Sequence, residues 1–181
     1  MLAVLLGIAL MPFGQQILNA PANMLDSFRL LNLSMKYDRN KNSCEGRFTG
    51  RLLVMKLGEM GQPQRAVEKL SDMVAREFAS QSVFLEAIGD DYRTVLKIDP
   101  GNKLTSEQFV ALCRPLDDML VGYLAKMRDR NDLSLEDVRY PVYFAGDLAQ
   151  AYKLHGANDK TLFWRQETIL AARTFKGGEH C

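Results

Sequence analysis

The stretch Thr105–Met127, TSEQFVALCRPLDDMLVGYLAKM, indicates the fold class more clearly than any other segment. Thr105 followed three residues later by Gln108 forms a capping box, which satisfies exposed backbone amides at a helix start. Apolar side chains then recur every three or four residues, which places them on one helical face. They are Phe109, Cys113, Leu116, Leu120, Tyr123 and Met127. Pro115 lies inside this helix and is expected to kink or divide it.

Comparable helical spacing occurs on both sides of this stretch, and no segment shows the period of two typical of a strand. Between the helices, the polar segment Asp38–Gly50 (DRNKNSCEGRFTG) is rich in turn-forming residues and is expected to be a loop. The sequence therefore predicts an all-α protein, an irregular bundle of about five to seven helices. The helices are expected over residues 22–37, 51–60, 63–88 and 105–127, with two more after Ser134 and Asp159.

The N-terminal part of the chain differs in composition from the rest. No charged side chain occurs before Asp26, and Leu2–Met11 is an unbroken apolar run as long as a signal-peptide core. Pro12 and Gly14 interrupt the run short of the roughly 20 residues that a membrane span needs. We therefore expect an apolar signal-like or anchor segment over residues 1–21 and a single helical domain over 22–181.

This segment sets the expected localisation. A signal or anchor predicts an exported protein, periplasmic or extracellular, or one attached to a membrane through residues 1–20. A basic region before the run is missing, and Pro21 is unfavourable after the possible cleavage position at Ala20. An N-terminal helix buried against the bundle is one alternative, and a true membrane span is the other.

The overall charge excludes one class of partner. The 181 residues include 23 basic and 22 acidic side chains, for a net charge of +1. A nucleic-acid-binding protein normally carries a basic stripe, so no nucleic-acid partner is expected.

Three cysteines, Cys44, Cys113 and Cys181, are widely spaced and form no Cys-x-x-Cys motif. A zinc site is therefore not expected. In an exported chain Cys44 and Cys113 are the candidate disulfide pair. In a cytosolic chain Cys113 is interpreted as a small buried hydrophobic residue.

A possible cation site is suggested by Asp38, Asn40 and Asn42, which fall at the first, third and fifth places of an EF-hand loop. The sixth place holds Ser43 instead of glycine, and the twelfth holds Thr49 instead of a bidentate glutamate. We therefore predict no metal site and no cofactor.

Candidate catalytic groups are few. Asp90–Asp91 and Asp117–Asp118 are carboxylate pairs, but neighbours on a helix point about 100° apart, so one pair alone cannot flank a reacting bond. Two pairs brought together would suit acid–base hydrolysis. His155 is the histidine available for a nucleophilic triad, although its position at a helix end also suits a basic side chain.

These observations predict a non-enzymatic, exported or envelope-associated helical protein that acts through protein–protein interaction. A small hydrolase using the aspartates and an apolar-ligand carrier are the alternatives. An aromatic set could line an apolar groove for a partner or ligand, although such side chains more often form core. The set is Tyr140, Tyr143, Phe144, Phe163 and Trp164.

Overall fold

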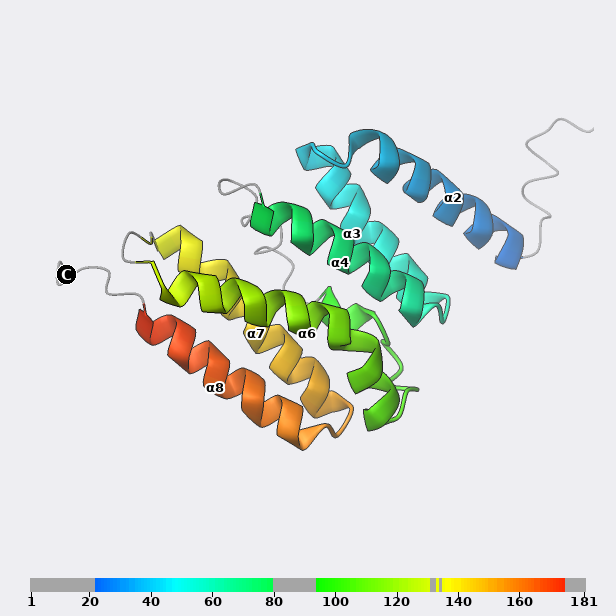
Figure 1. The fold of residues 1–181 in the computed structure, drawn as a ribbon. Helices are drawn as coiled ribbons and strands as arrows, with labels where there is room; N and C mark the ends of the chain where they lie inside the picture. Colours follow the sequence, from blue (N-terminus) through cyan, green and yellow to red (C-terminus); the bar gives the residue numbers. More distant parts are fainter. Residues whose placement is uncertain (1–21, 80–93, 131–132, 134, 175–181) are drawn as a thin grey trace, which may run out of the picture.

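The structure is a computed structural model, and it describes residues 22–79, 94–130, 133 and 135–174. These residues form six α-helices and one short 3₁₀ helix, and none of them lies in a strand (Figure 1). The all-α prediction is therefore confirmed. The elements are α2 (Ala22–Asn40), α3 (Cys44–Glu59), α4 (Pro63–Ala79), η1 (Val95–Lys97), α6 (Ser106–Arg128), α7 (Leu135–Leu154) and α8 (Asn158–Thr174).

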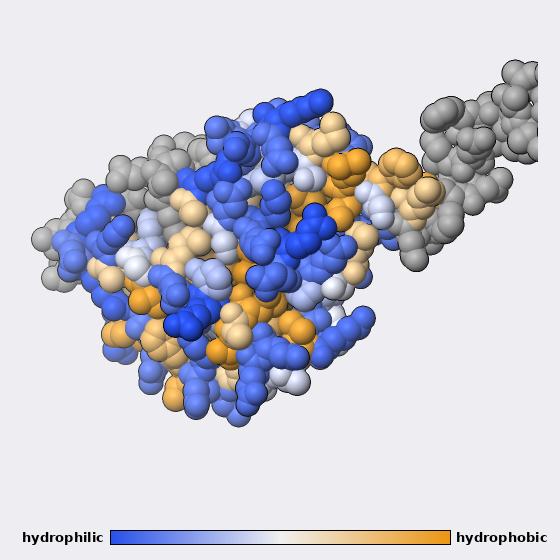
Figure 2. All heavy atoms as spheres, turned by 45° about the vertical axis from the view of Figure 1, so that its right-hand side comes forward, coloured by the Kyte–Doolittle hydropathy of each residue, from blue (hydrophilic) through white to orange (hydrophobic). Residues whose placement is uncertain are grey.

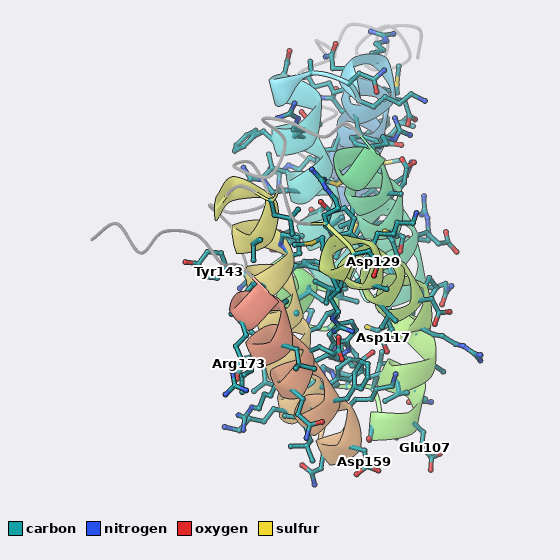
Figure 3. The ribbon with its side chains drawn as sticks, turned by 60° about the vertical axis from the view of Figure 1, so that its left-hand side comes forward. Glu107, Asp117, Asp129, Tyr143, Asp159 and Arg173 are labelled. Carbon is teal, nitrogen blue, oxygen red and sulfur yellow. The ribbon has the colours of Figure 1, made fainter. Side chains whose placement is uncertain are left out.

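The helices pack in two groups of three. In the first group α2 packs on α3 and α3 packs on α4, while in the second α7 packs on α8 and both contact α6. Contacts between α4 and α6 join the groups, and η1 touches both α3 and α7. As a result α2 and α8 lie at opposite edges of the molecule (Figures 1 and 3).

Buried side chains from both groups form one continuous apolar cluster. Its largest fully buried members come from all six α-helices, and they include Tyr37, Leu57, Leu70, Phe109, Tyr152 and Trp164. Most of the predicted stripe of α6 is part of it, because Phe109, Cys113, Leu116, Leu120 and Met127 are buried and Tyr123 is half-buried.

The polar segment Asp38–Gly50 was predicted to be a loop, and this prediction is wrong. Helix α2 continues to Asn40, and α3 begins at Cys44 after a turn of three residues. Ser43 caps α3 by accepting a hydrogen bond from the amide of Gly46 at 3.1 Å. The cap signal was present in the sequence, but the glycines beside it favoured a loop.

Those glycines allow two helices to approach closely. A Cβ atom built on Gly46 would lie 1.9 Å from the carbonyl oxygen of Asn40, and one on Gly50 would lie 2.8 Å from the Tyr37 ring. Both positions therefore exclude a side chain because α2 and α3 are in contact there. Glycine inside a helix costs up to about 1 kcal/mol relative to alanine, which this packing offsets.

The predicted start of α6 is confirmed, because Thr105 and Gln108 form both bonds of the capping box. Pro115 does not divide the helix, which runs unbroken from Ser106 to Arg128. A proline removes a single backbone donor, and the buried stripe on both sides of Pro115 holds the helix together. Pro141 is likewise enclosed within α7.

Candidate functional site

A buried carboxylate, Asp117, lies among the three helices of the second group (Figure 3). It is 3% exposed and sits on the core side of α6, one turn after Cys113. Its Oδ1 accepts hydrogen bonds from the Tyr152 hydroxyl of α7 and the Trp164 indole of α8, both at 2.9 Å. Its Oδ2 accepts one from the Lys160 ammonium group of α8 at 2.6 Å. We call these four residues the Asp117 cluster.

Burial and the charge of Asp117 affect the acidity of two neighbouring groups. Burial, followed by the negative charge of Asp117, raises the pKa of the Tyr152 hydroxyl and of the Cys113 thiol well above their ordinary values. Both groups therefore stay protonated at neutral pH. Cys113 is not activated as a nucleophile, because the thiolate is the reactive form.

Each oxygen of Asp117 already has a donor within the fold. A catalytic carboxylate must reach the proton that it transfers, whereas here both oxygens are directed at Tyr152, Trp164 and Lys160. The arrangement satisfies a buried charge and ties α7 and α8 to α6. Its chemistry is that of structural stabilisation.

A second buried polar pair connects the turn after η1 with the end of α7. The Nε2 atom of His155 lies 3.0 Å from Asp99 Oδ2, and its Nδ1 atom lies 2.8 Å from the carbonyl oxygen of Ala151. The imidazole also stacks on the Phe109 ring, with ring centroids 3.6 Å apart. Each ring nitrogen of His155 therefore faces an oxygen atom from another part of the fold or from the preceding turn.

Asp99 has a further partner within its own turn. Its Oδ2 accepts the backbone amide of Leu104 at 2.9 Å. Burial opposes the ionisation of Asp99, but the hydrogen bonds from Leu104 and His155 outweigh it and lower the pKa of this carboxyl. The side chains of His155 and Asp99 are only 4% and 8% exposed, so the pair closes a turn and does not line a cleft.

Of the other predicted catalytic residues the structure describes Asp118, and it is brought to neither site. Asp118 is exposed on α6 and lies 3.9 Å from Arg114 of the same helix, whereas its neighbour Asp117 is buried. Asp90 and Asp91 lie outside the described residues. Convergence of the two carboxylate pairs therefore stays a prediction.

The candidate cation ligands belong to a helix end. Asp38 and Asn40 are the last residues of α2, and Asp38 pairs with Lys69 of α4 at 3.6 Å. The carbonyl oxygen of Asn40 accepts the hydroxyl and the amide of Ser43. Among the described residues, no three His, Cys, Asp or Glu side chains lie close enough to hold a metal ion.

The structure describes the side chain of one of the three cysteines. Cys113 is a free thiol, fully buried in the core. The side chain of Cys44 and the whole of Cys181 lie outside the described part of the chain, so the Cys44–Cys113 pair stays a prediction.

The aromatic set divides between core and surface. Phe144 and Trp164 are buried, whereas Tyr143 and Phe163 are exposed, and the side chain of Tyr140 lies outside the described ones. The exposed members lie on α7 and α8. They accompany three aliphatic residues on the outside of α8, which are Leu162, Ile169 and Leu170.

The outer face of α2 is apolar and exposed. Its apolar spacing predicts a helix correctly, yet four of the residues in that pattern face solvent. We call these residues the α2 stripe: Met24, Phe28, Leu31 and Met35, each between 46% and 60% exposed. The helix packs on the bundle instead through Leu30 and Tyr37, on its other side.

A surface groove runs beside the α2 stripe, between α2, α3 and α4, with a volume of about 360 Å³. Leu30, Leu53 and Leu57 line its buried part, while Arg65 and Lys69 of α4 contribute charged groups to its lining. The groove is open to solvent and mixed in polarity, unlike the enclosed apolar cavity expected of a lipid or ligand carrier.

The residues that complete the two buried polar sites could not be identified from the sequence alone. Tyr152, Lys160 and Trp164 lie 35 to 47 residues from Asp117, and His155 lies 56 residues from Asp99. No local motif links partners at such separations. The available signal was weaker: Asp117 follows Leu116 on the apolar face of a helix, where a charged residue needs a partner.

Comparison with protein-family models, curated proteins and solved structures gives no significant match to this chain. The fold and the sites define a class only, an all-helical bundle with buried polar contacts between its helices. Within the described ranges, no helix is both long enough and apolar enough to cross a membrane.

Proposed function

We propose that this chain is a non-enzymatic protein of the cell envelope or exported space that acts by binding another protein. The observation that carries the proposal is the outward apolar surface of α8. Leu162 and Ile169 lie two turns apart on one side of this helix and are 58% and 51% exposed. Surface patches of this kind mark sites of protein contact more often than sites of chemistry.

The contacts of the buried polar groups support the same proposal. Asp117 and His155, the two described catalytic candidates that are buried, each contact partners from other parts of the fold. A hydrolase needs at least one carboxylate directed at a cleft. The hydrolase and carrier alternatives have no comparable observation in their favour.

The proposal is tested by photo-crosslinking in cells that produce the chain. A photo-reactive amino acid replaces Leu162 or Ile169 in separate variants, and the control replaces Lys126, which is exposed on α6. We expect the two α8 positions to give the same protein adduct, identified by mass spectrometry, and the control to give none.

A polar variant makes this test specific. Leu162→Glu should abolish the adduct formed from position 169. It should leave the unfolding transition unchanged, because the Leu162 side chain is mostly exposed and contributes little to the core. If neither α8 position yields a protein adduct, or the control yields the same one, α8 is not a docking surface.

A further inference from the structure

We propose that the α2 stripe rests on a membrane surface that carries anionic lipids. The proposal deepens one part of the proposed function, because it rests on the association of the chain with the envelope. It assigns α2 to the lipid surface and leaves α8, at the opposite edge of the bundle, free for a protein partner (Figure 1).

The geometry of the stripe suits a helix lying in a membrane interface. At about 100° per residue, Met24, Phe28, Leu31 and Met35 fall within an arc of roughly 60°. Leu30 and Tyr37, which hold α2 on the bundle, lie on the other side of the helix. The stripe can therefore enter the headgroup region without displacing any core contact.

The chain that precedes α2 supplies the argument for lipid. The sequence from Met1 to Leu25 contains no charged side chain, and α2 begins within it, at Ala22. The stripe starts at Met24, so it continues the uncharged segment onto the surface of the bundle. Figure 2 shows apolar side chains gathered at this end of the molecule. Lipid attraction for Leu2–Met11 would bring the stripe to the same surface.

Charge on α2 adds a preference for anionic lipids. Arg29, Lys36 and Arg39 are exposed and lie on the same flank of the stripe. Among the described residues no ion pair engages Lys36 or Arg39, and Arg29 reaches Asp26 only at 3.8 Å. Basic residues flanking an apolar face are typical of helices that lie on anionic membranes.

Of the two carboxylates of α2, Asp26 lies on the far side from the stripe, whereas Asp38 lies at the edge of the stripe, one turn beyond Met35, with 59% of its side chain exposed. Asp26 pairs with Lys56 of α3 at 2.9 Å, and Asp38 pairs with Lys69 of α4 at 3.6 Å. Their charges are thus partly balanced by lysines of the helices behind α2. The unbalanced charge of the helix is positive.

The area of the stripe alone is small for pairing with a second copy of the chain. Four side chains that are about half exposed present roughly 400 Å², about half of the ~800 Å² that each partner contributes to a standard protein interface. A lipid surface needs no matching shape and no minimum area, because binding strength follows the apolar area buried. A second copy of the chain paired through this stripe alone would therefore be weakly held.

The test places a reporter on the stripe of the full chain. Phe28→Trp and Leu162→Trp substitute residues of nearly equal exposure, 60% and 58%, on α2 and α8. The native Trp164 is fully buried and gives a common background. Each variant is mixed with vesicles of equal parts phosphatidylcholine and phosphatidylserine, with and without bromine on the acyl chains, and tryptophan fluorescence is recorded.

We expect brominated lipid to quench Phe28→Trp and to leave Leu162→Trp at the level of the parent protein. The proposal is overturned if the chain does not float with the vesicles, or if it floats and position 28 is not quenched. Equal quenching at both positions also overturns it, since the orientation is then random. Self-association that Phe28→Gln removes, without lipid quenching, would instead assign the stripe to a second copy.

A second pair of variants measures the contribution of the stripe to binding. Phe28→Gln should weaken binding to the same vesicles about tenfold, and Leu162→Gln should leave it unchanged. Arg29→Gln combined with Lys36→Gln should weaken binding to anionic vesicles several-fold and to phosphatidylcholine vesicles hardly at all. Equal binding by Phe28→Gln and Leu162→Gln would contradict the proposal.

Failure of this inference can be told from failure of the proposed function. Loss of lipid contact at position 28 with a protein adduct still formed at position 162 removes the membrane surface only. The reverse result removes the protein partner and leaves the membrane surface.

Discussion

At the scale of single residues, the decisive group is Asp117, which the sequence marks only as one of two adjacent aspartates. The structure separates them, because Asp117 lies on the buried side of α6 and Asp118 on the exposed side. Position on the helix could be predicted from the apolar stripe. The identity of the partners could not, since Tyr152, Lys160 and Trp164 reach Asp117 only after three helices have packed.

The first prediction compares these two neighbours. Asp117→Ala should lower the free energy of unfolding by roughly 3 kcal/mol, because it leaves the Tyr152 hydroxyl and the Trp164 indole buried without their acceptor. Asp118→Ala should change it by less than about 0.5 kcal/mol, as expected for an exposed site. Urea unfolding followed by circular dichroism measures both. Equal effects would show that the Asp117 cluster contributes no particular stability.

The second prediction concerns Cys113. Its thiol is fully buried, and burial followed by the charge of Asp117 raises its pKa, so it should resist alkylation in the folded protein and react fully in urea. Iodoacetamide labelling and peptide mass spectrometry follow this residue separately from the other two cysteines. Rapid labelling of Cys113 in native buffer would contradict the burial.

The third prediction is a pH dependence that arises from Asp99. Its pKa is lowered in the folded protein, so its contribution to stability is present above the pKa of the unfolded chain, about 3.9. That contribution is lost as the pH falls through the lower folded value. Asp72 acts in the same direction, because hydrogen bonds from Arg76 and Tyr37 outweigh its burial and lower its pKa.

Titration of stability tests this account. Between pH 5 and pH 3 the parent protein should lose more unfolding free energy than Asp99→Asn, which has no carboxylate to protonate there. Asp118→Asn, altered at an exposed site, should follow the parent. Parallel curves for the parent and Asp99→Asn would show that the buried pair with His155 does not depend on ionisation of Asp99.

At the scale of elements, the helices that could be predicted were those with a cap and a buried stripe. Helix α6 has both, and its start was located correctly at Thr105. The start of α3 was missed, because Gly46 and Gly50 resemble loop residues when only local sequence is considered. Their reason for being glycine lies in α2, across the interface, where Asn40 and Tyr37 leave no space for a side chain.

The fourth prediction follows from that interface. Gly46→Ala should destabilise the protein by roughly 1–3 kcal/mol, since its Cβ would overlap the Asn40 carbonyl. Gly122→Ala, on α6 where no atom lies within 4 Å of the new Cβ, should stabilise it by about 0.5–1 kcal/mol. Thermal unfolding of the two variants compares them directly. Stabilisation by both would mean that α2 and α3 are farther apart than described.

At the scale of the whole molecule, the fold class was predictable and the orientation of its surfaces was not. Periodicity identified α2 as a helix, but it cannot say whether an apolar face meets the core or the solvent. That choice depends on which face the neighbouring helix covers. Here α3 covers the side of Leu30 and Tyr37, and the α2 stripe is left outside.

Two outward apolar surfaces therefore lie at opposite edges of the bundle, and the buried polar groups hold the helices between them. We propose that these two surfaces bind different partners: the α2 stripe binds a membrane and α8 binds a protein. The uncharged segment before Asp26 runs in sequence into the stripe, which faces outward from the bundle.

The most direct measurement is photo-crosslinking from both faces of the full chain in membranes of the producing cells. A photo-reactive amino acid is placed at position 28, 162 or 126, and adducts are sized by mass spectrometry. We expect a lipid adduct at position 28, a protein adduct at position 162 and no adduct at position 126. Protein adducts at 28 with none at 162, or the same adducts at all three positions, would contradict this proposal.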